Sequence, residues 1–435
     1  MSDVTLKPFD KPFTATAAVP GSKSLTNRAL ILAALASGIS ELSNILLADD
    51  TRVMLQGLEK LGFPLQIDVV SHSVKVTGAA GKIPASTADL FCGNSGTTIR
   101  FLAALCALGS GAYTLDGIPR MRLRPIAELV EPLRNLGSRV DYLGQPGYPP
   151  IRITADGLPG GLLKYGSAAS SQFLSALLMA SPYARHEVHV DLQGPQTSWP
   201  YVAMTMQLMD HFGITAELLR DPITGEPRQI VIPRSTYIAT QYTIEPDASN
   251  AAYFLATAAI HPGAKVTIPG LGTTSFQGDV GIANVLKKMG ADIILTKDSV
   301  TVAGTDTLEG IDVDLLPMPD QAQTLAVVAL FAHGPTILRG LHTLRVKETD
   351  RLAALSTELQ KFGANVTVGG DDTLTIQPPN HPQPATVDTY DDHRMAMSFA
   401  IAATKITGVT IKDTQCVNKT YPDFFTDLEK LRSQA

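Results

Sequence analysis

Hydrophobic positions along the chain follow a helical pattern that repeats. A helix with one apolar face ends in an apolar-x-x-apolar-Gly motif, first at 58–62. Apolar residues three or four positions apart line one helix face, and a glycine just past the last turn readily adopts the left-handed conformation that ends a helix. Further copies follow at intervals of 73 to 77 residues, at 133–137, 209–213, 286–290 and 359–363, with a last copy lacking the glycine at 428–431. The pattern predicts a chain of six repeated units.

A second helix, richer in alanine, opens each unit. Its residues are apolar nearly all round, which places it inside the protein, whereas the Gly-terminated helices keep a polar face. Short β-rich runs such as 74–76 and 229–232 lie between the units and predict strands. The expected buried helices are 27–37, 97–108, 171–180, 249–260, 321–332 and 393–403. Strands that alternate with helices in this way predict an α/β fold, and six units favour two lobes of three.

The expected lobes follow from turn signals and from the position of the first strand. The stretch 220–227 contains two prolines and a glycine and predicts a hairpin just before the boundary. We therefore expect one lobe at 21–240 and a second made of 1–20 plus 241–435. The first strand, within 5–19, precedes the first buried helix, so we expect it to pair within the second lobe.

Composition narrows the class of protein. Of the 435 residues 44% are hydrophobic and 17% charged, so the chain can bury large cores. It contains no apolar run long enough to span a bilayer and no signal peptide, and its three scattered cysteines fit a reducing cytoplasm. A net charge of -6 argues against a nucleic-acid partner. Affinity for anions would therefore come from local clusters.

Polar and charged residues gather where the buried helices begin. The first helix is entered through Lys23, Ser24 and Arg28. A helix N-terminus offers free N–H donors and a partial positive charge, so it suits a phosphate or a carboxylate. At one helix an ordinary N-cap explains the residues equally well, but repetition favours anion sites. The other helix starts hold Asn94, Ser95, Gly96 and Arg100, then Ser170, Ser171 and Gln172, then Asp247, then Asp320, and finally Asp392, His393 and Arg394.

Three basic stretches lie outside those helix starts: 120–125, 345–351 and 418–422. In the second, we expect a helix on which Lys347 and Arg351, four residues apart, share one face. Each stretch also has an ordinary explanation: a solvated rim for the three arginines of the first, and a surface ion pair of Glu348 with Arg351 for the second. In the third, Lys419 alone indicates no site. The triplet 391–393 has the composition of a metal site, but neighbouring residues on a helix face different ways, so no metal is predicted.

Together these motifs resemble the 5-enolpyruvylshikimate-3-phosphate synthase family of enolpyruvyl transferases, which join phosphoenolpyruvate to shikimate 3-phosphate and release phosphate. The family's fold is an inverse α/β barrel: two lobes, each of three βαβαββ units with buried parallel helices, and an active site in the cleft between them. The resemblance implies two small-molecule substrates, no cofactor, no nucleic acid, no membrane and a monomer. The matching stretches are 20–28, 90–100, 120–125, 170–173, 319–320, 345–351, 391–397 and 419–423.

The resemblance also implies which residues hold each substrate. For shikimate 3-phosphate they are Lys23, Ser24, Arg28, Ser170, Ser171, Gln172, Ser198, Asp320, Thr343 and Lys347. For phosphoenolpyruvate they are Lys23, Asn94, Gly96, Arg124, Gln172, Arg351, Arg394 and Lys419. The sequence departs from the family pattern at two positions. Thr343 stands where many members have Asn, and Phe101 follows Arg100 where many have Pro.

The chemistry needs one base and one acid. By resemblance Asp320 takes the proton of the shikimate 5-hydroxyl, Glu348 delivers a proton to the enol carbon, and Lys23 offsets charge at the bridging oxygen. By analogy with the family, Gly96 is expected to leave room for glyphosate in the place of phosphoenolpyruvate.

Two alternatives stay open. Transferases acting on UDP-N-acetylglucosamine usually carry a reactive Cys in the loop near 117–121, and this loop has none. A non-catalytic protein that binds phosphorylated metabolites would not need an acid and a base beside its cationic cluster.

Overall fold

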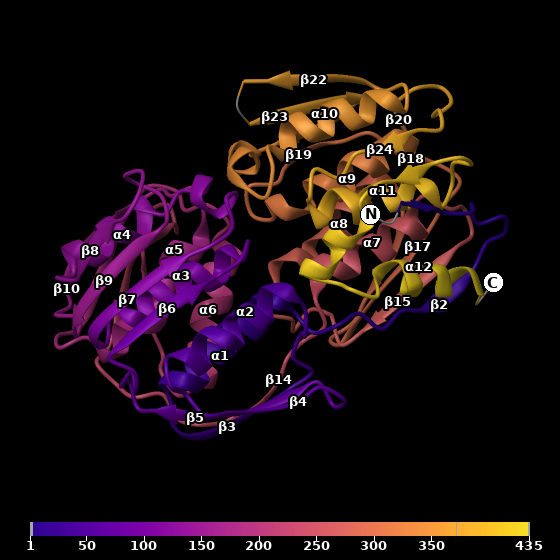
Figure 1. The fold of residues 1–435 in the computed structure, drawn as a ribbon. Coiled ribbons are helices and arrows are strands. Elements are labelled where there is room, and N and C mark those ends of the chain that lie inside the picture. The colour runs from indigo at the N-terminus through magenta and orange to yellow at the C-terminus, as the bar shows by residue number, and fades with distance from the viewer. Residues whose placement is uncertain (1–2, 371, 434–435) are drawn as a thin grey trace. The chain divides into compact units, whose positions relative to one another are not determined.

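The computed structural model describes residues 3–370 and 372–433. The chain forms two compact units, which we call unit 1 (up to Pro20 and from Glu245 onward) and unit 2 (Gly21–Ile244) (Figure 1). The division falls after Ile244 rather than after residue 240, because β14 (Gln241–Thr243) pairs in parallel with β3 (Ser37–Ser43) of unit 2.

Every residue of unit 2 is described, and its strands form three sheets of one pattern. A parallel pair is followed by two antiparallel partners, so that the order β6-β7-β9-β8 arises from a βαβαββ chain path. The other two sheets have the orders β14-β3-β5-β4 and β10-β11-β13-β12. Besides β3 and β14, the strands of these sheets are β4 (Leu65–Asp68), β5 (Ser73–Ala79), β6 (Thr87–Phe91), β7 (Ser110–Asp116), β8 (Arg139–Tyr142), β9 (Ile151–Asp156), β10 (Gly161–Gly166), β11 (Val188–Gln193), β12 (Glu217–Arg220) and β13 (Pro227–Ile232).

Among the described residues of unit 1, the same four-stranded pattern occurs in β2-β15-β17-β16 and in β19-β21-β23-β22. A three-stranded sheet, β1-β25-β24, and a short pair, β18-β20, complete the unit. The strands are β1 (Val4–Thr5), β2 (Thr14–Thr16), β15 (Lys265–Pro269), β16 (Asp292–Leu295), β17 (Ser299–Ala303), β18 (Leu308–Glu309), β19 (Asp312–Asp314), β20 (Ala332–His333), β21 (Thr336–Arg339), β22 (Asn365–Gly369), β23 (Thr373–Gln377), β24 (Thr386–Val387) and β25 (Thr410–Ile411).

The first strands of the chain pair as predicted, within unit 1. β2 lies parallel to β15, and β1 lies antiparallel to β25. Unit 2 in turn receives its first strand, β14, from the stretch just before the chain returns to unit 1. Each unit therefore completes one sheet with a strand that is distant in sequence.

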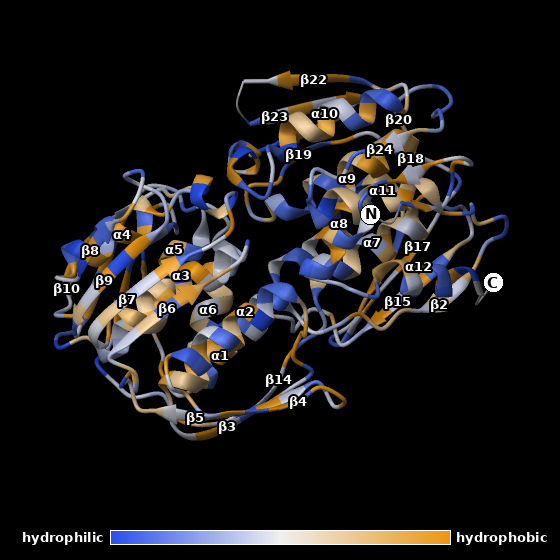
Figure 2. Ribbon diagram, in the orientation of Figure 1, coloured by the Kyte–Doolittle hydropathy of each residue, from blue (hydrophilic) through white to orange (hydrophobic). Residues whose placement is uncertain are grey.

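The alanine-rich helices form the buried interior of each unit, and four of the six have bounds within two residues of the prediction. The predicted helix 321–332 is too long, because the α-helix ends at Val328 and the chain continues as a 3₁₀ turn over Ala329–Phe331. α1 begins earlier than expected, at Lys23, because the hydroxyl of Ser22 accepts a hydrogen bond from the Leu25 backbone N–H at 3.4 Å and caps the helix. In Figure 2 α3 and α5 lie mostly in the hydrophobic colour range. These helices are α1 (Lys23–Leu35), α3 (Gly96–Cys106), α5 (Ser171–Ala180), α7 (Ala248–Ala259), α9 (Ala322–Val328) and α11 (His393–Ala403).

The Gly-terminated helices lie outside and have mixed faces. Gly62, Gly137, Gly213, Gly290 and Gly363 all have positive φ, between 87° and 112°, so each ends its helix in the left-handed conformation. The outer helices are α2 (Asp49–Lys60), α4 (Ala127–Asn135), α6 (Trp199–His211), α8 (Ile282–Met289), α10 (Arg351–Lys361) and α12 (Phe424–Ser433). No helix in the described ranges combines the length and the apolarity needed to cross a membrane.

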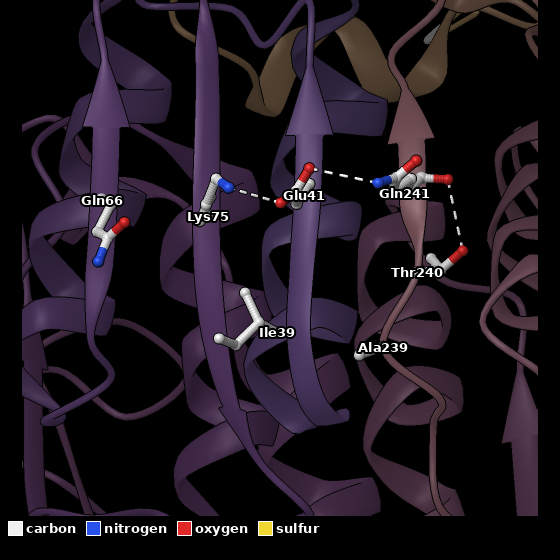
Figure 3. A pocket seen from close by; sticks show the side chains of 7 residues that line it. All are labelled: Ile39, Glu41, Gln66, Lys75, Ala239, Thr240 and Gln241. Atoms are coloured by element: carbon white, nitrogen blue, oxygen red, sulfur yellow. Dashed lines mark hydrogen bonds and ion pairs between the residues drawn. The ribbon is translucent and has the colours of Figure 1, made fainter.

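The sheet that receives β14 has an open, polar face (Figure 3). Lys75 Nζ lies 2.6 Å from Glu41 Oε1, and Gln241 Nε2 donates to Glu41 Oε2 at 3.4 Å. These side chains stand in register across neighbouring strands and help to fix β14 in the sheet. A shallow hollow of about 410 Å³ lies on this face.

Candidate active site

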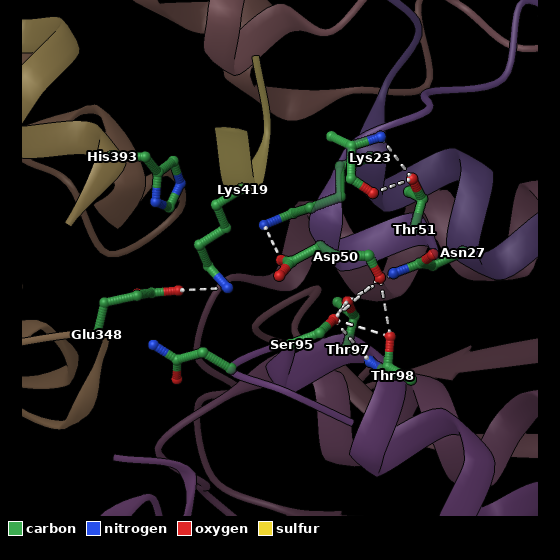
Figure 4. A network of polar contacts seen from close by, with 12 residues as sticks. Lys23, Asn27, Asp50, Thr51, Ser95, Thr97, Thr98, Glu348, His393 and Lys419 are labelled. Carbon is green, nitrogen blue, oxygen red and sulfur yellow. Dashed lines mark hydrogen bonds and ion pairs between the residues drawn. The ribbon is translucent and has the colours of Figure 1, made fainter. Parts of the chain in front are cut away.

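Lys23 is the first residue of α1, where a buried carboxylate holds it (Figure 4). Its Nζ lies 3.1 Å from Asp50 Oδ2. The backbone carbonyl of Asp50 accepts hydrogen bonds from Ser95 Oγ at 3.3 Å and Thr98 Oγ1 at 3.1 Å, at the start of α3. Asp50 therefore links the N-terminal ends of two buried helices. The sequence analysis did not identify Asp50, because acidic residues are common in the first turn of a helix, where they interact favourably with the helix dipole.

Gly96 begins α3 between two guanidinium groups. A β-carbon at this position would lie 2.7 Å from Arg124 Nη2 and 3.0 Å from Arg100 Nη1. Arg124 is buried, and its Nη1 donates to the Asn94 carbonyl at 2.9 Å and to Asn94 Oδ1 at 3.3 Å. Only a residue without a side chain leaves both arginines where they are. Gly96, Asn94 and Arg124, predicted together from sequence, do lie together.

The start of α5 adds a polar group to the same part of unit 2. Ser170 caps the helix, its Oγ accepting from the Gln172 backbone N–H at 3.3 Å. Arg100 Nη1 donates to Gln172 Oε1 at 2.5 Å. Ser170, Ser171 and Gln172 are all partly exposed, so a ligand could reach them.

Arg28 lies deeper than the other predicted ligands. It is 1% exposed, and its guanidinium donates to Thr205 Oγ1 at 2.7 Å, to Ser175 Oγ at 3.1 Å and to the Ser24 carbonyl at 3.0 Å. Burial lowers the pKa of Arg28 to about 10, so it still carries its charge at neutral pH. These contacts join α1 to α5 and α6, and a direct contact of Arg28 with substrate stays a prediction.

Ser198 occupies the N-cap position of α6 with φ 51° and ψ 46°. This left-handed conformation is uncommon for a residue with a side chain and marks a position fixed by its surroundings. Ser198 is also the one predicted ligand of unit 2 outside the helix starts and basic runs identified from sequence.

In unit 1, Asp320 is the centre of a cationic cluster. Its carboxylate lies 3.0 Å from Arg351 Nη1, 3.0 Å from Arg394 Nη2 and 3.8 Å from Lys347 Nζ. Burial opposes its charge, but Arg394, Lys347 and Arg351 outweigh that effect and hold the pKa of the carboxyl well below its usual range. The side chain keeps 22% exposure, so a ligand can still reach it.

Arg351 is clamped by three carboxylates. Besides Asp320, its Nε donates to Asp392 Oδ2 at 2.7 Å and its Nη2 donates to Glu348 Oε2 at 2.9 Å. Burial alone would lower its pKa, but the charges of Asp392, Glu348 and Asp320 raise the pKa of Arg351 above the ordinary value. Asp392 also caps α11 by accepting from the Arg394 backbone N–H at 2.9 Å. Asp392 therefore orients Arg351, a role that the sequence pattern did not reveal.

The predicted helix carrying Lys347 and Arg351 on one face is wrong. Lys347 follows the 3₁₀ turn η6 (His342–Val346) in an extended conformation, and α10 begins only at Arg351. The helix starts there because Asp350 Oδ1 accepts from the Ala353 backbone N–H at 3.1 Å and caps it. The two cations nevertheless meet, because both reach Asp320.

Glu348 and Lys419 form a second pair in unit 1, with Lys419 Nζ 3.8 Å from Glu348 Oε1 (Figure 4). Both side chains are largely buried.

Thr343 is also buried, and its hydroxyl has no hydrogen-bond partner among the described residues. A buried hydroxyl without a partner is costly, so a polar ligand group would satisfy it.

Two arginines of the stretch 120–125 have different surroundings. Arg122 is exposed and pairs with Asp116, its Nε donating to Asp116 Oδ1 at 2.9 Å, whereas Arg124 is buried beside Gly96. The ordinary explanation, a solvated side chain at the rim, therefore holds for Arg122.

Comparison with known proteins gives consistent results along the whole chain. Residues 9–428 match the family described as EPSP synthase (3-phosphoshikimate 1-carboxyvinyltransferase). A 3-phosphoshikimate 1-carboxyvinyltransferase of Vibrio atlanticus is 44% identical over 434 residues, covering 99% of this chain and 100% of the relative. A chloroplastic 3-phosphoshikimate 1-carboxyvinyltransferase of Brassica napus is 45% identical over 449 residues, covering 99% of this chain and 85% of the relative.

Solved structures agree with the fold. The EPSP synthase from Acinetobacter baumannii aligns with TM-score 0.81 and 26% identity, covering 99% of this chain and 98% of that one. The enolpyruvyl transferase NikO from Streptomyces tendae aligns with TM-score 0.77 and 18% identity, covering 98% and 96%. The predicted enolpyruvyl transferase fold is thereby confirmed.

Proposed function

The chain belongs to the EPSP synthase (3-phosphoshikimate 1-carboxyvinyltransferase) family, and from this membership we infer that it transfers the enolpyruvyl group of phosphoenolpyruvate to the 5-hydroxyl of shikimate 3-phosphate, releasing phosphate. The protein is thus a transferase of the shikimate pathway, which leads to the aromatic amino acids. The observation that carries the assignment is the full-length family match. The two alternatives from sequence, a UDP-N-acetylglucosamine transferase and a non-catalytic binding protein, are not favoured by it.

We propose that residues of both units serve one pair of substrates. Unit 2 would supply the helix starts at Lys23, Gly96 and Ser170, whose N–H groups and neighbouring arginines suit phosphate and carboxylate oxygens. Unit 1 would supply Arg351, Arg394 and Lys419 for phosphoenolpyruvate, with Thr343 and Lys347 for shikimate 3-phosphate. A monomeric state and a cytoplasmic location belong to this proposal.

The proton transfers fall to Asp320 and Glu348. In the addition step, Asp320 would accept the proton of the attacking 5-hydroxyl while Glu348 protonates C3 of the enol. In the elimination step, in which phosphate leaves, the two residues would exchange these roles. A carboxyl with a strongly lowered pKa is a weak base, but bound phosphoenolpyruvate would bring negative charge to Arg351 and Arg394. That charge weakens their hold on Asp320 and raises the pKa of the carboxyl toward the range useful for a base.

Lys23 would neutralise charge on the oxygen that bridges the carbon skeleton and the departing phosphate. Its contact with Asp50 keeps the ammonium group in place before the substrates bind. Asp50 would thus reduce the ordering cost of binding.

Incubating the protein with shikimate 3-phosphate and phosphoenolpyruvate tests the assignment. Mass spectrometry should show the enolpyruvyl ether, with one phosphate released for each product molecule formed. Replacing shikimate 3-phosphate with UDP-N-acetylglucosamine is the control and should give neither. Product only with the sugar nucleotide, or no product with either acceptor, would contradict the assignment.

Gly96→Ala provides a prediction about inhibition. We propose that glyphosate competes with phosphoenolpyruvate at this place, and that the added methyl group, 2.7 Å from Arg124 Nη2 in the present geometry, displaces that guanidinium. Glyphosate inhibition should weaken by about tenfold or more, because a guanidinium–anion hydrogen bond is worth about that factor. Inhibition constants measured against varied phosphoenolpyruvate check this, and equal inhibition of both forms would reject it.

A further inference from the structure

The turn that leads into α11 has a conformation rare for its residue types. Tyr390 and Asp391 have φ of 55° and 53°, in the left-handed region that residues with side chains seldom occupy. Such a turn persists only where its surroundings hold it. The next residue is Asp392, which orients Arg351 and caps α11. Whatever holds the turn therefore also sets the position of Asp392.

A buried glutamate of α10 binds this turn. Glu358 is 0% exposed, its Oε1 accepts from the Tyr390 hydroxyl at 2.6 Å, and its Oε2 accepts from the Asp388 backbone N–H at 3.1 Å. Glu358 follows Arg351 by two helical turns, so both lie on one face of α10. That face contacts both ends of the segment 388–392. Glu358 binds the backbone of Asp388 at one end, and Arg351 binds the carboxylate of Asp392 at the other.

Lys361 completes this contact. Its Nζ lies 2.7 Å from Glu358 Oε2 and 2.7 Å from Asp388 Oδ2, and it donates to the Thr386 carbonyl at 3.2 Å. The ammonium group compensates the buried carboxylate, which would otherwise be costly. Both oxygens of Glu358 thus have partners, and the carboxylate is held in one orientation.

We infer that Glu358 and Tyr390 are positioning residues for the phosphoenolpyruvate side of the site. The inference rests on the proposed function, in which Arg351 and Arg394 bind that substrate. By fixing the turn, the pair keeps Asp392 against Arg351 and sets the start of α11, which carries Arg394. Thr343 and Lys347, assigned to shikimate 3-phosphate, lie in and just after η6, outside the segment 388–392.

Tyr390→Phe tests the inference, because it removes one hydroxyl and leaves the ring. A hydrogen bond to a charged group is worth about tenfold, so KM for phosphoenolpyruvate should rise by up to about tenfold. KM for shikimate 3-phosphate and kcat should stay at the values of the unmodified enzyme. Glu358→Gln should act in the same direction. Steady-state kinetics with each substrate varied against a saturating concentration of the other measures all three constants.

Tyr113→Phe is a control of the same substitution in the other unit. Tyr113 is a buried tyrosine of unit 2 whose hydroxyl donates to the Ala85 carbonyl at 2.8 Å, so it reports the general effect of losing such a bond. An unchanged KM for phosphoenolpyruvate in Tyr390→Phe would overturn the inference. An equal rise of both KM values, matching Tyr113→Phe, would also overturn it, because general destabilisation explains that result.

A readout independent of turnover separates this inference from the function itself. Arg351 Nε–H donates to Asp392 Oδ2, and its ¹⁵N–¹H resonance should shift in Tyr390→Phe but not in Tyr113→Phe. If the unmodified protein forms no product, the proposed function fails. The resonance would still show whether the hydrogen bond between Tyr390 and Glu358 positions Arg351. An unshifted resonance in Tyr390→Phe would show that it does not.

Discussion

Asp320→Asn should lower kcat by about 10² to 10⁴, the usual contribution of a positioned general base. The amide keeps the size of the side chain but cannot accept the proton of the attacking hydroxyl. The affinity for phosphoenolpyruvate should hold or improve, because the carboxylate of Asp320 otherwise competes with the substrate for Arg351 and Arg394. Single-turnover kinetics and calorimetric titration measure the two effects separately.

Asp312→Asn is the control for this experiment. Asp312 is an exposed aspartate of the same unit, paired with Arg339 at 2.7 Å, and such surface pairs contribute little. Its kcat should equal that of the unmodified enzyme. A kcat for Asp320→Asn close to that of Asp312→Asn would remove Asp320 from the proposed chemistry.

Arg351→Met should lower the free energy of unfolding by about 3–5 kcal/mol, because removing one member of a buried charge cluster leaves its partners uncompensated. Asp392 is 0% exposed, and its carboxylate would lose the guanidinium that lies 2.7 Å away. The same change removes a proposed ligand of phosphoenolpyruvate, so KM for that substrate should rise. Urea unfolding and steady-state kinetics measure the two losses.

The loss of stability should depend on pH in a known direction. The pKa of Asp320 is lower in the folded protein than in the unfolded chain, so the folded state binds fewer protons. The stability that this carboxylate gains from its cations is therefore present above about pH 4 and is lost as pH falls toward the folded pKa. The difference between Arg351→Met and the unmodified protein should be largest near neutral pH and should narrow below about pH 4.

Arg339→Met is the matched control. Arg339 forms two hydrogen bonds to Asp312, each 2.7 Å long, but its side chain is 49% exposed. Its loss should change stability by no more than about 1 kcal/mol. If both arginine variants lose the same stability, burial of the Arg351 cluster is not what makes it strong.

Much of the fold follows from local patterns in the sequence. The Gly-terminated helices and the alanine-rich helices were found because helical periodicity and glycine after the last turn act over a few residues. The bounds predicted for α5 and α11 agree with the structure at both ends. Local patterns failed at 345–351, where the capping side chain of Asp350 starts α10 later than the charge spacing indicated.

By itself, the sequence determined six repeated units, an α/β class and the helix starts at which cations gather. Only the tertiary structure decided how distant carboxylates are shared: Asp320 meets Arg394 across 74 residues, Asp392 meets Arg351 across 41, and Asp50 meets Lys23 across 27. The reason is physical. Helix formation depends on neighbours within a few residues, whereas a buried ion pair exists only once folding has removed its two members from water and brought them together.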